Sequence, residues 1–323
     1  MKAITQDTYG SVDVLELRDV DAPVPGDDDV LIQVRAAGVD QGVWHLMTGL
    51  PYLTRVIGFG LTRPKTRIRG RAVAGRVEAI GRNVVGFRPG DEVYGTCEGS
   101  FAEYACAKEG KLALKPKSLS FEQAAAVPIS AVTALQALRD AGKVQAGQEV
   151  LVIGAAGGVG TYAVQLAKAF GAQVTGVCST AKTDLVRSIG ADHVIDYTHD
   201  DFADGSRQFD LIVDTAGNRP LSVLRRALKP KGTLAIVGGE GGGRLAGGIG
   251  RSLGAGLLSV FVGQRLTGVM SAERAEDLRF LTGLIEAGAV TPVIGKSYAL
   301  ADAPAAIRDL RAGQLRGKAV ITI

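Results

Sequence analysis

The sequence predicts an α/β protein with two domains, one rich in β-strands and one built on a doubly wound parallel sheet. Its 323 residues exceed the usual length of a single domain. Residues 1 to about 120 alternate short apolar runs with Gly, Pro and Asp clusters, a pattern typical of β-structure. After about residue 121, short strands alternate with helical segments, which indicates βαβ units.

The β-rich domain is predicted over residues 1–122 and the parallel-sheet domain over residues 123–262. In the first domain the expected strands are the apolar runs at 30–34, 73–80, 101–106 and 111–114. In the second domain, helical stretches at 121–127 and 131–141 precede five short strands. These strands lie near Val150, Val174, Val194, Leu211 and Leu234 and recur every 17 to 24 residues.

The remaining residues, 263–323, are predicted to return to the first domain. They hold a helical pattern at 272–287, an apolar pair at 293–294, a short helix at 303–312 and a final strand at 319–323. The stretch Leu245–Val262 is the most membrane-like part of the chain, but Arg244, Arg251 and many glycines interrupt it. We therefore expect a buried connection and a strand there, and no membrane span.

A glycine-rich turn follows the strand near Val150 and leads directly into a helical pattern. The apolar run ends at Ile153, and the turn reads Ala155-x-Gly157-x-x-Gly160. Glycines let the backbone approach a pyrophosphate, and the helix N-terminus directs N–H groups at its charge. The turn therefore predicts a dinucleotide site; the alternative is a tight turn without a nucleotide. The residues predicted to bind are Ala155, Ala156, Gly157, Gly158, Val159 and Gly160.

The end of the next strand favours a phosphorylated ribose. NAD sites usually have an acid there, about 20 residues beyond the glycines. Here the strand is followed by Ser179, Thr180 and Lys182, with no carboxylate before Asp184. Hydroxyls and an ammonium group suit a 2′-phosphate, so we expect NADPH as the cofactor. The alternative for Lys182 is a solvated position in the first turn of a helix. Tyr197, after the third strand, is a candidate for packing on the adenine or phosphate, or a rim tyrosine without a ligand.

Composition excludes several function classes. Charged residues make up 22% and hydrophobic residues 46% of the chain, as in soluble globular proteins. A net charge of +4, without interleaved aromatic and basic residues, argues against nucleic acid and membrane partners. Cys97, Cys106 and Cys178 have neither metal-ligand spacing nor an even count for disulfides. No apolar leader follows Met1, so we expect a reduced, cytoplasmic protein.

Several motifs in order give the chain a resemblance to a known family. They are Gly154–Lys168, the Val84-x-x-Phe87-x-x-Gly90-Asp91-x-Val93 stretch, Gly99–Tyr104, Ala124–Pro128, Gly190–Asp192 and Arg316–Lys318. Together they resemble the zinc-independent quinone oxidoreductase (zeta-crystallin-like) branch of the medium-chain dehydrogenase/reductases. The resemblance implies a chaperonin-10-like β-barrel catalytic domain, a Rossmann nucleotide domain, the substrate in the cleft between them and a homodimer formed through the nucleotide domains.

Assignment to the zinc-independent branch rests on the residues at the expected metal positions. Asp40 stands where zinc-dependent relatives have a cysteine, and Gly70-Arg71-Ala72 replaces their Gly-His-Glu segment. No cysteine lies near Pro128, and the Tyr94–Phe101 loop holds only Cys97. Three N or S ligands cannot be assembled from these positions, so we predict no metal site. Without a Lewis acid, reduction of an already activated acceptor is favoured over alcohol oxidation.

The resemblance also places candidate residues around the reacting groups. Asp40, His45 and Tyr52 are the polar residues expected to face the acceptor. The alternatives are that Asp40 orients a neighbouring loop and that His45 packs beside Trp44. The branch commonly has asparagine at the position of Asp40 and tyrosine at that of His45, so the catalytic face departs from the family pattern.

Further cofactor contacts are expected at the carboxyl ends of the parallel strands. Ser130 and Thr133 follow the segment that, by resemblance, lies beside the nicotinamide. The loop candidates are Thr215, Ala216 and Gly217 after the fourth strand, Val237, Gly238 and Gly239 after the fifth, and Phe261 and Val262 for the carboxamide. Arg316 is a second candidate for the 2′-phosphate, or a solvated arginine.

The resemblance implies an NADPH-dependent enzyme that delivers hydride to a quinone or an α,β-unsaturated carbonyl, a small electrophilic acceptor. The first alternative is a zinc-independent enoyl-thioester reductase, for which the six cations of the Arg55–Arg71 segment would attract coenzyme A phosphates. A solvated loop explains the same cations. The second alternative is a nucleotide-binding protein that uses the fold without turnover.

Overall fold

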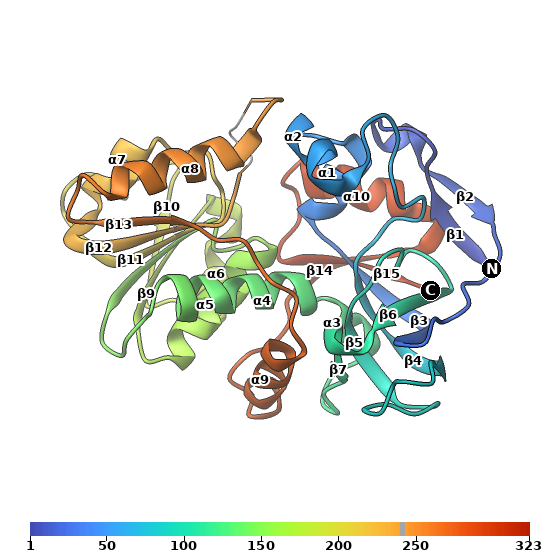
Figure 1. Cartoon of the computed structure of the whole chain (residues 1–323). Helices are drawn as coiled ribbons and strands as arrows, with labels where there is room; N and C mark the ends of the chain where they lie inside the picture. The colour runs from blue at the N-terminus through green and yellow to red at the C-terminus, as the bar shows by residue number, and fades with distance from the viewer. Residues whose placement is uncertain (240–242) are drawn as a thin grey trace. The chain divides into compact units, whose positions relative to one another are not determined.

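The computed structural model describes residues 1–239 and 243–323, which divide into two compact units (Figure 1). The first unit contains residues 1–132, 273–288 and 292–323, and the second contains residues 133–272 and 289–291. The sequence-based domain boundaries, near residues 122 and 262, are thus both earlier than the points at which the chain changes unit.

The second unit is built on a six-stranded parallel sheet with the order β10-β9-β8-β11-β12-β13. In chain order this is 3-2-1-4-5-6, the arrangement of a Rossmann domain. The strands are β8 (Glu149–Ile153), β9 (Gln173–Cys178), β10 (His193–Asp196), β11 (Phe209–Asp214), β12 (Leu228–Ile236) and β13 (Arg265–Gly268). The five predicted strands are therefore confirmed, as is the doubly wound parallel sheet.

Helices cover both faces of this sheet, with α5 on one face and α7 and α8 on the other (Figure 1). The helices of this region are α4 (Pro128–Gln136), α5 (Gly158–Ala169), α6 (Thr183–Ser188), α7 (Leu221–Arg226) and α8 (Gly247–Ser259). Because both faces are covered, strands such as β8 are apolar without alternation, and Val150–Ile153 are all buried.

The expected buried strand within Leu245–Val262 is wrong, because this segment forms helix α8 and the sixth strand starts only at Arg265. The helix is also largely exposed, with Leu253 and Leu257 65% and 70% accessible. Its apolar residues suggested burial, but they project from one face of a surface helix. No helix among the described residues is long and apolar enough to cross a membrane.

The first unit contains two sheets. A seven-stranded sheet has the order β14-β15-β3-β4-β5-β7, with β6 paired to β3, and a separate sheet pairs β1 with β2. The strands are β1 (Lys2–Thr5), β2 (Glu16–Asp19), β3 (Asp29–Val39), β4 (Ala72–Ile80), β5 (Glu92–Thr96), β6 (Tyr104–Lys108), β7 (Leu112–Leu114), β14 (Ile294–Ala299) and β15 (Lys318–Thr322). The predicted runs thus correspond to β3, β4, β6 and β7.

The helices of the first unit are α1 (Gln41–Thr48), α2 (Tyr52–Thr54), α3 (Phe121–Ala125), α9 (Ala275–Glu286) and α10 (Ala303–Arg311). Short 3-10 or π turns occur at Val12–Val14, Arg55–Phe59, Glu109–Lys111, Ala137–Ala141, Thr180–Lys182 and Leu300–Asp302. The C-terminal strand β15 pairs antiparallel with β3, so Ala319 lies opposite Val39. This pairing brings the end of the chain beside the predicted acceptor residues that follow β3.

Candidate functional site

The glycine turn has the geometry that a dinucleotide requires. Gly154, directly after β8, has φ +81°, a conformation that favours glycine. A Cβ on Gly160 would lie 2.0 Å from the Gly154 carbonyl oxygen, so only glycine allows this close approach of helix and strand. Helix α5 begins after Gly157 with no side-chain cap, which leaves the first-turn N–H groups for a ligand. The chain thus fits a bound pyrophosphate.

The neighbouring strand β11 ends in a buried carboxylate that organises the adjacent loops. Asp214 is fully buried; its Oδ1 accepts a hydrogen bond from the Gly217 N–H (3.0 Å), and its Oδ2 lies 2.6 Å from Arg251 Nη2. The Thr215 hydroxyl donates to the Ile153 carbonyl oxygen at 2.7 Å. The predicted residues at this edge, including Ala216, therefore frame the glycine turn, and Thr215 ties β11 to β8.

The loop after β12 is also tied to Asp214. The N–H groups of Val237 and Gly238 both donate to its carbonyl oxygen at 2.9 Å. A Cβ on Gly238 would lie 2.3 Å from the Thr215 carbonyl oxygen. The predicted Val237–Gly239 segment therefore lies at the same edge as the glycine turn, but the amides of its first two residues are already used.

The predicted 2′-phosphate residues lie together at the end of β9. Ser179 precedes a short 3-10 turn that contains Thr180 and Lys182. A carboxylate that sequence reasoning missed, Asp196 at the end of β10, joins them. Hydrogen bonds from the hydroxyls of Thr180 and Thr198 lower the pKa of Asp196. Tyr197, the next residue, is half exposed.

The remaining predicted cofactor residues lie in several different parts of the structure. Ser130 and Thr133 are both buried on α4. Phe261 and Val262 precede β13, whereas the glycine turn follows β8, so in a parallel sheet they lie at the opposite edge. Their assignment to the carboxamide is wrong, because the strand expected within Leu245–Val262 does not form there. The strand of this region is β13, and its carboxyl end is Gly268. Arg316 is exposed, just before β15.

In the first unit, Asp40 is the N-cap of helix α1. Its Oδ1 accepts a hydrogen bond from the Gly42 N–H at 2.8 Å, while its buried Oδ2 has no hydrogen-bond partner among the described residues. Lys318, on β15, is buried nearby and donates to the Val39 carbonyl oxygen at 2.9 Å. Burial lowers the pKa of Lys318, and the Asp40 carboxylate opposes this effect. Asp40 thus caps the start of α1, and its role toward the acceptor stays a prediction.

The other two predicted acceptor residues lie at the end of α1 and just beyond it. His45 Nδ1 lies 2.7 Å from the Leu50 carbonyl oxygen, in the last turn of α1. Tyr52 is 42% exposed and stacks against Arg55, whose guanidinium carbon is 4.9 Å from the ring centre. The same guanidinium donates to the Gly49 carbonyl oxygen at 2.9 Å. Arg55 therefore closes the end of α1 and is not a freely solvated cation.

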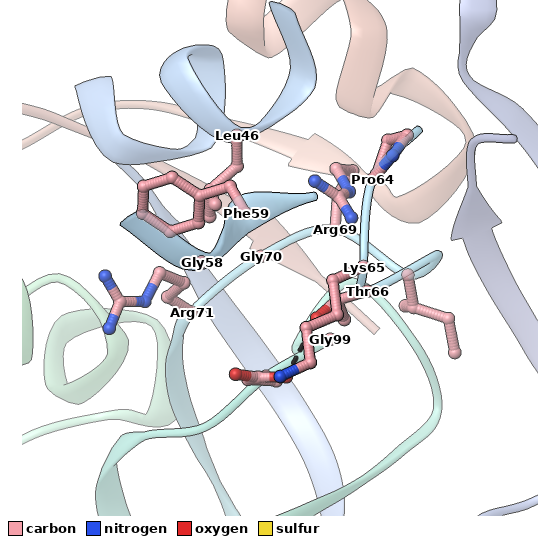
Figure 2. Close-up of a pocket in the computed structure, with 12 residues that line it drawn as sticks. Leu46, Gly58, Phe59, Pro64, Lys65, Thr66, Arg69, Gly70, Arg71 and Gly99 are labelled. Carbon is pink, nitrogen blue, oxygen red and sulfur yellow. Dashed lines mark hydrogen bonds between the residues drawn. The ribbon is translucent and has the colours of Figure 1, made fainter. Parts of the chain in front are cut away.

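A cavity of about 270 Å³ lies within the first unit, and Figure 2 shows the residues that line it. Its lining comes from α1, the segment between Gly58 and Arg71, and the loop after β5. The residues are Leu46, Gly58, Phe59, Pro64, Lys65, Thr66, Ile68, Arg69, Gly70, Arg71, Glu98 and Gly99. Asp40, His45 and Tyr52 are not among them, although Leu46 directly follows His45.

The comparisons with known proteins agree with both units. Residues 26–117 match the alcohol dehydrogenase GroES-like domain, and residues 189–321 match the family described as zinc-binding dehydrogenase. A quinone oxidoreductase from Sus scrofa is 32% identical over 325 residues, which cover 96% of this chain and 94% of that protein. The chain belongs to the quinone oxidoreductase branch of the medium-chain dehydrogenase/reductases.

Two further relatives extend this comparison. A 2-methylene-furan-3-one reductase from Solanum lycopersicum is 39% identical over 253 residues, which cover 74% of this chain and 62% of that protein. A mycobacterial protein solved in complex with NADPH is 28% identical, with a TM-score of 0.85 and full coverage of both chains. This member of the family is accordingly an NAD(P)H oxidoreductase.

Arg71, at a position where the resemblance expects a zinc ligand in zinc-dependent relatives, has a different environment. Arg71 forms an ion pair with Glu273, which also accepts from Thr96 and Lys111. Burial alone would raise the pKa of Glu273, but Arg71 and Lys111 outweigh it and the pKa lies below its usual value. Within residues 1–239 and 243–323, no group of three or more His, Cys, Asp or Glu side chains could hold a metal.

Sequence reasoning missed two buried cations of this oxidoreductase, Lys318 and Arg69, and the partly buried Arg251. Arg251 pairs with Asp214, Lys318 lies beside Asp40, and Arg69 is only 3% exposed. Lys318 and Arg69 stand in basic stretches that suggest solvent exposure, and Arg251 interrupts an apolar, glycine-rich stretch. The residues that surround these three side chains come from distant parts of the sequence, so no local pattern reveals their environment.

Proposed function

We propose that this oxidoreductase uses NADPH to reduce a quinone or an α,β-unsaturated carbonyl without zinc. The observation that carries the proposal is the glycine turn at the switch point of the 3-2-1-4-5-6 sheet, followed by a helix without a side-chain cap. The names of the relatives supply the acceptor class, since a quinone and an enone both present an electron-poor carbon conjugated to a carbonyl.

NADPH supplies a hydride from C4 of its nicotinamide, and the chain supplies binding and orientation. The first turn of α5 holds the pyrophosphate through backbone N–H groups. Ser179, Thr180 and Lys182 hold the 2′-phosphate by hydrogen bonds and charge, which supports a preference for NADPH over NADH. Thr215 keeps the two strands at the switch point in register.

On the acceptor side, the chain must stabilise the oxygen that gains charge when hydride reaches the conjugated carbon. His45 and Tyr52 remain the proposed donors, because both lie in the last turn of α1 or just beyond it and Arg55 adds positive charge beside Tyr52. The proton that completes the reduction comes from solvent, so a dedicated acid is not required.

Oxidation of NADPH in the presence of 1,4-benzoquinone, an alkenal and crotonyl coenzyme A tests the proposal. Turnover of the first two, with NADPH favoured over NADH, is the expected result. Turnover of the thioester alone would favour the enoyl-thioester reductase. Binding of NADPH without turnover of any acceptor would favour a non-catalytic nucleotide-binding protein.

We also propose that the protein is a cytoplasmic homodimer. Leu253, Leu257, Val260 and Phe261 are 65% to 84% exposed and follow helical spacing along and just beyond α8. An apolar row of this kind suits an interface between two copies. Cys97, Cys106 and Cys178 are free thiols, as in a reducing compartment. Light scattering of the protein and of Leu257→Lys tests the dimer: a monomeric wild type, or a variant dimer of unchanged stability, would contradict it.

A further inference from the structure

Arg69 has a buried charge that forms no ion pair with any described residue, and the Glu98 carboxylate stabilises it only without direct contact. Arg69 lies between β1 and the loop after β5, where its backbone N–H donates to Ile4 and its carbonyl accepts from Phe101. Its side chain is buried, and Nε has no hydrogen-bond partner among the described residues. None of the ion pairs found among residues 1–239 and 243–323 includes it. A buried cation without a partner is costly, so this position calls for an explanation.

Three other cations of the Arg55–Arg71 segment differ from Arg69 because their side chains have partners. Arg67 pairs with Asp7 at the surface, Arg71 pairs with Glu273, and Arg55 donates to backbone carbonyls. Burial lowers the pKa of Arg69 to about 10, while Tyr9 and Glu98 oppose the effect. The guanidinium therefore keeps its charge at neutral pH.

The side chain of Arg69 lines the cavity of the first unit. Figure 2 shows it beside Pro64 at one end, with Phe59 and Leu46 across the cavity. Gly70 separates Arg69 from Arg71 with φ +91°, and a Cβ there would lie 2.4 Å from Phe101 and Ser100 side-chain atoms. Only glycine allows this turn, which fixes where Arg69 leaves the backbone.

The cavity also contains an acid, but one that is already engaged. Glu98 is exposed, and its Oε2 accepts a hydrogen bond from the Thr66 hydroxyl at 2.8 Å. The lining combines the apolar side chains of Leu46, Phe59 and Ile68 with three cations, because Lys65 and Arg71 line the cavity as well as Arg69. A volume of about 270 Å³ is just below the range of about 300–1,000 Å³ typical of ligand sites, so a small molecule fits.

We propose that this cavity binds the carboxylate of an amphipathic acceptor, with the Arg69 guanidinium as its anion-binding group and the apolar lining around its hydrocarbon body. A planar guanidinium binds a carboxylate through two parallel N–H bonds, which gives both affinity and orientation. The proposal rests on the proposed function, because it specifies the acceptor as an enone that carries an acid group.

The test uses a matched pair of acceptors, 4-oxo-4-phenylbut-2-enoate and its methyl ester. In each, hydride from NADPH and a solvent proton add across the C=C bond, giving the saturated ketone and NADP⁺. We expect kcat/KM to be at least about tenfold higher for the acid than for the ester. We also expect calorimetry without cofactor to show the saturated product, 4-oxo-4-phenylbutanoate, binding at least about tenfold more tightly than its methyl ester.

Variants assign the preference to Arg69. Arg69→Gln should lower kcat/KM for the acid by about tenfold or more and leave the ester within about twofold. Arg69→Lys should lie between Gln and wild type, because it keeps the charge and loses the fork. Arg67→Gln, which removes an exposed charge two residues away, should change neither substrate. Equal effects of Arg69→Gln on acid and ester would overturn the proposal.

The two proposals fail in different ways. If neither acid nor ester is reduced, the proposed function fails, and calorimetry with the saturated pair still decides whether the cavity binds a carboxylate. If the ester is reduced as fast as the acid and both saturated products bind alike, the proposed function stands and the anion site is wrong. This comparison uses the wild type alone, so it holds even if Arg69→Gln does not fold.

Discussion

The second unit, or nucleotide unit, and the first unit, which contains the GroES-like domain and is called the barrel unit, build their sites from different parts of the chain. At the glycine turn, the groups that would bind are backbone amides, and one contiguous segment from Ile153 to Gly160 supplies them. In the barrel, the site consists of side chains, and their partners come from far away. Arg71 pairs with Glu273 across 202 residues of sequence.

This difference determines which substitutions each site tolerates. A site made of backbone amides requires the ligand and the neighbouring backbone to approach closely, so it loses binding when a side chain is added. A side-chain site depends on charge balance, so it changes when a partner is removed or reversed. The departures from the family pattern that the resemblance indicates, at Asp40, His45 and Arg71, all lie in the first unit.

The largest expected effect is that of Gly160→Ala, which tests the dependence on close approach. The added Cβ would lie 2.0 Å from the Gly154 carbonyl oxygen, and both partners are backbone. Overpacking of this kind costs about 1–3 kcal/mol of stability. Displacing the helix N-terminus should weaken NADPH binding by about 100-fold, measured by fluorescence titration alongside thermal unfolding.

Gly157→Ala is the matched control for that variant. Its Cβ would lie 3.3 Å from the same oxygen, and its φ of −85° suits any residue. We expect normal stability with weakened NADPH binding, because the side chain would face the pyrophosphate. Normal NADPH affinity of Gly160→Ala would show that the turn is not the cofactor site.

The same contrast explains which features the sequence alone reveals. The strands at Val150 through Leu234 were predictable because a covered sheet requires continuous apolar runs. Helix α1 was missed, although Asp40 as N-cap and Gly49 with φ +63° as C-cap are both local signals. Helix α8 was missed for a different reason. Its apolar row looks like buried structure until the sheet is known, and this error also misplaced Phe261.

The residues of the candidate site also divide into those that local sequence patterns reveal and those that depend on tertiary structure. The glycine turn and the Ser179–Lys182 segment are short sequence patterns, and the structure brings the residues of each together. Asp196 was not predicted because its relation to Thr180 depends on the pairing of β10 with β9. Arg69 was not predicted as buried because nothing in a basic stretch distinguishes a buried arginine from a solvated one.

A second prediction tests side-chain recognition within the nucleotide unit. Lys182→Ala should weaken NADPH binding by about tenfold, since a charged hydrogen-bond partner contributes about 1.5–3 kcal/mol, and leave NADH binding nearly unchanged. Asp196→Asn should act in the opposite direction, strengthening NADPH binding, because it removes a negative charge beside Thr180. An equal loss for both cofactors in Lys182→Ala would exclude the assignment of a 2′-phosphate site.

A third prediction concerns the exposed cations of the barrel, Arg63 and Lys65. If they guide an anionic acceptor, charge reversal of both should raise KM for crotonyl coenzyme A by about two- to fivefold, and added salt should do the same. KM for 1,4-benzoquinone should stay constant. If both substrates respond alike, or neither does, the loop is only solvated surface and the thioester activity loses its support.

The smallest expected effect is that of a metal chelator, which should leave activity unchanged. At the two positions where the resemblance would place a zinc-binding cysteine and histidine, Asp40 caps α1 and Arg71 pairs with Glu273. Cys97 is buried, and burial raises the pKa of its thiol, so it is a poor source of the thiolate that zinc prefers. Cys97→Ser should therefore keep its turnover.

Elemental analysis of the purified protein should find well under one equivalent of zinc. A stoichiometric metal whose removal abolishes turnover would overturn this assignment and would show that the barrel builds a side-chain site that these residues do not reveal.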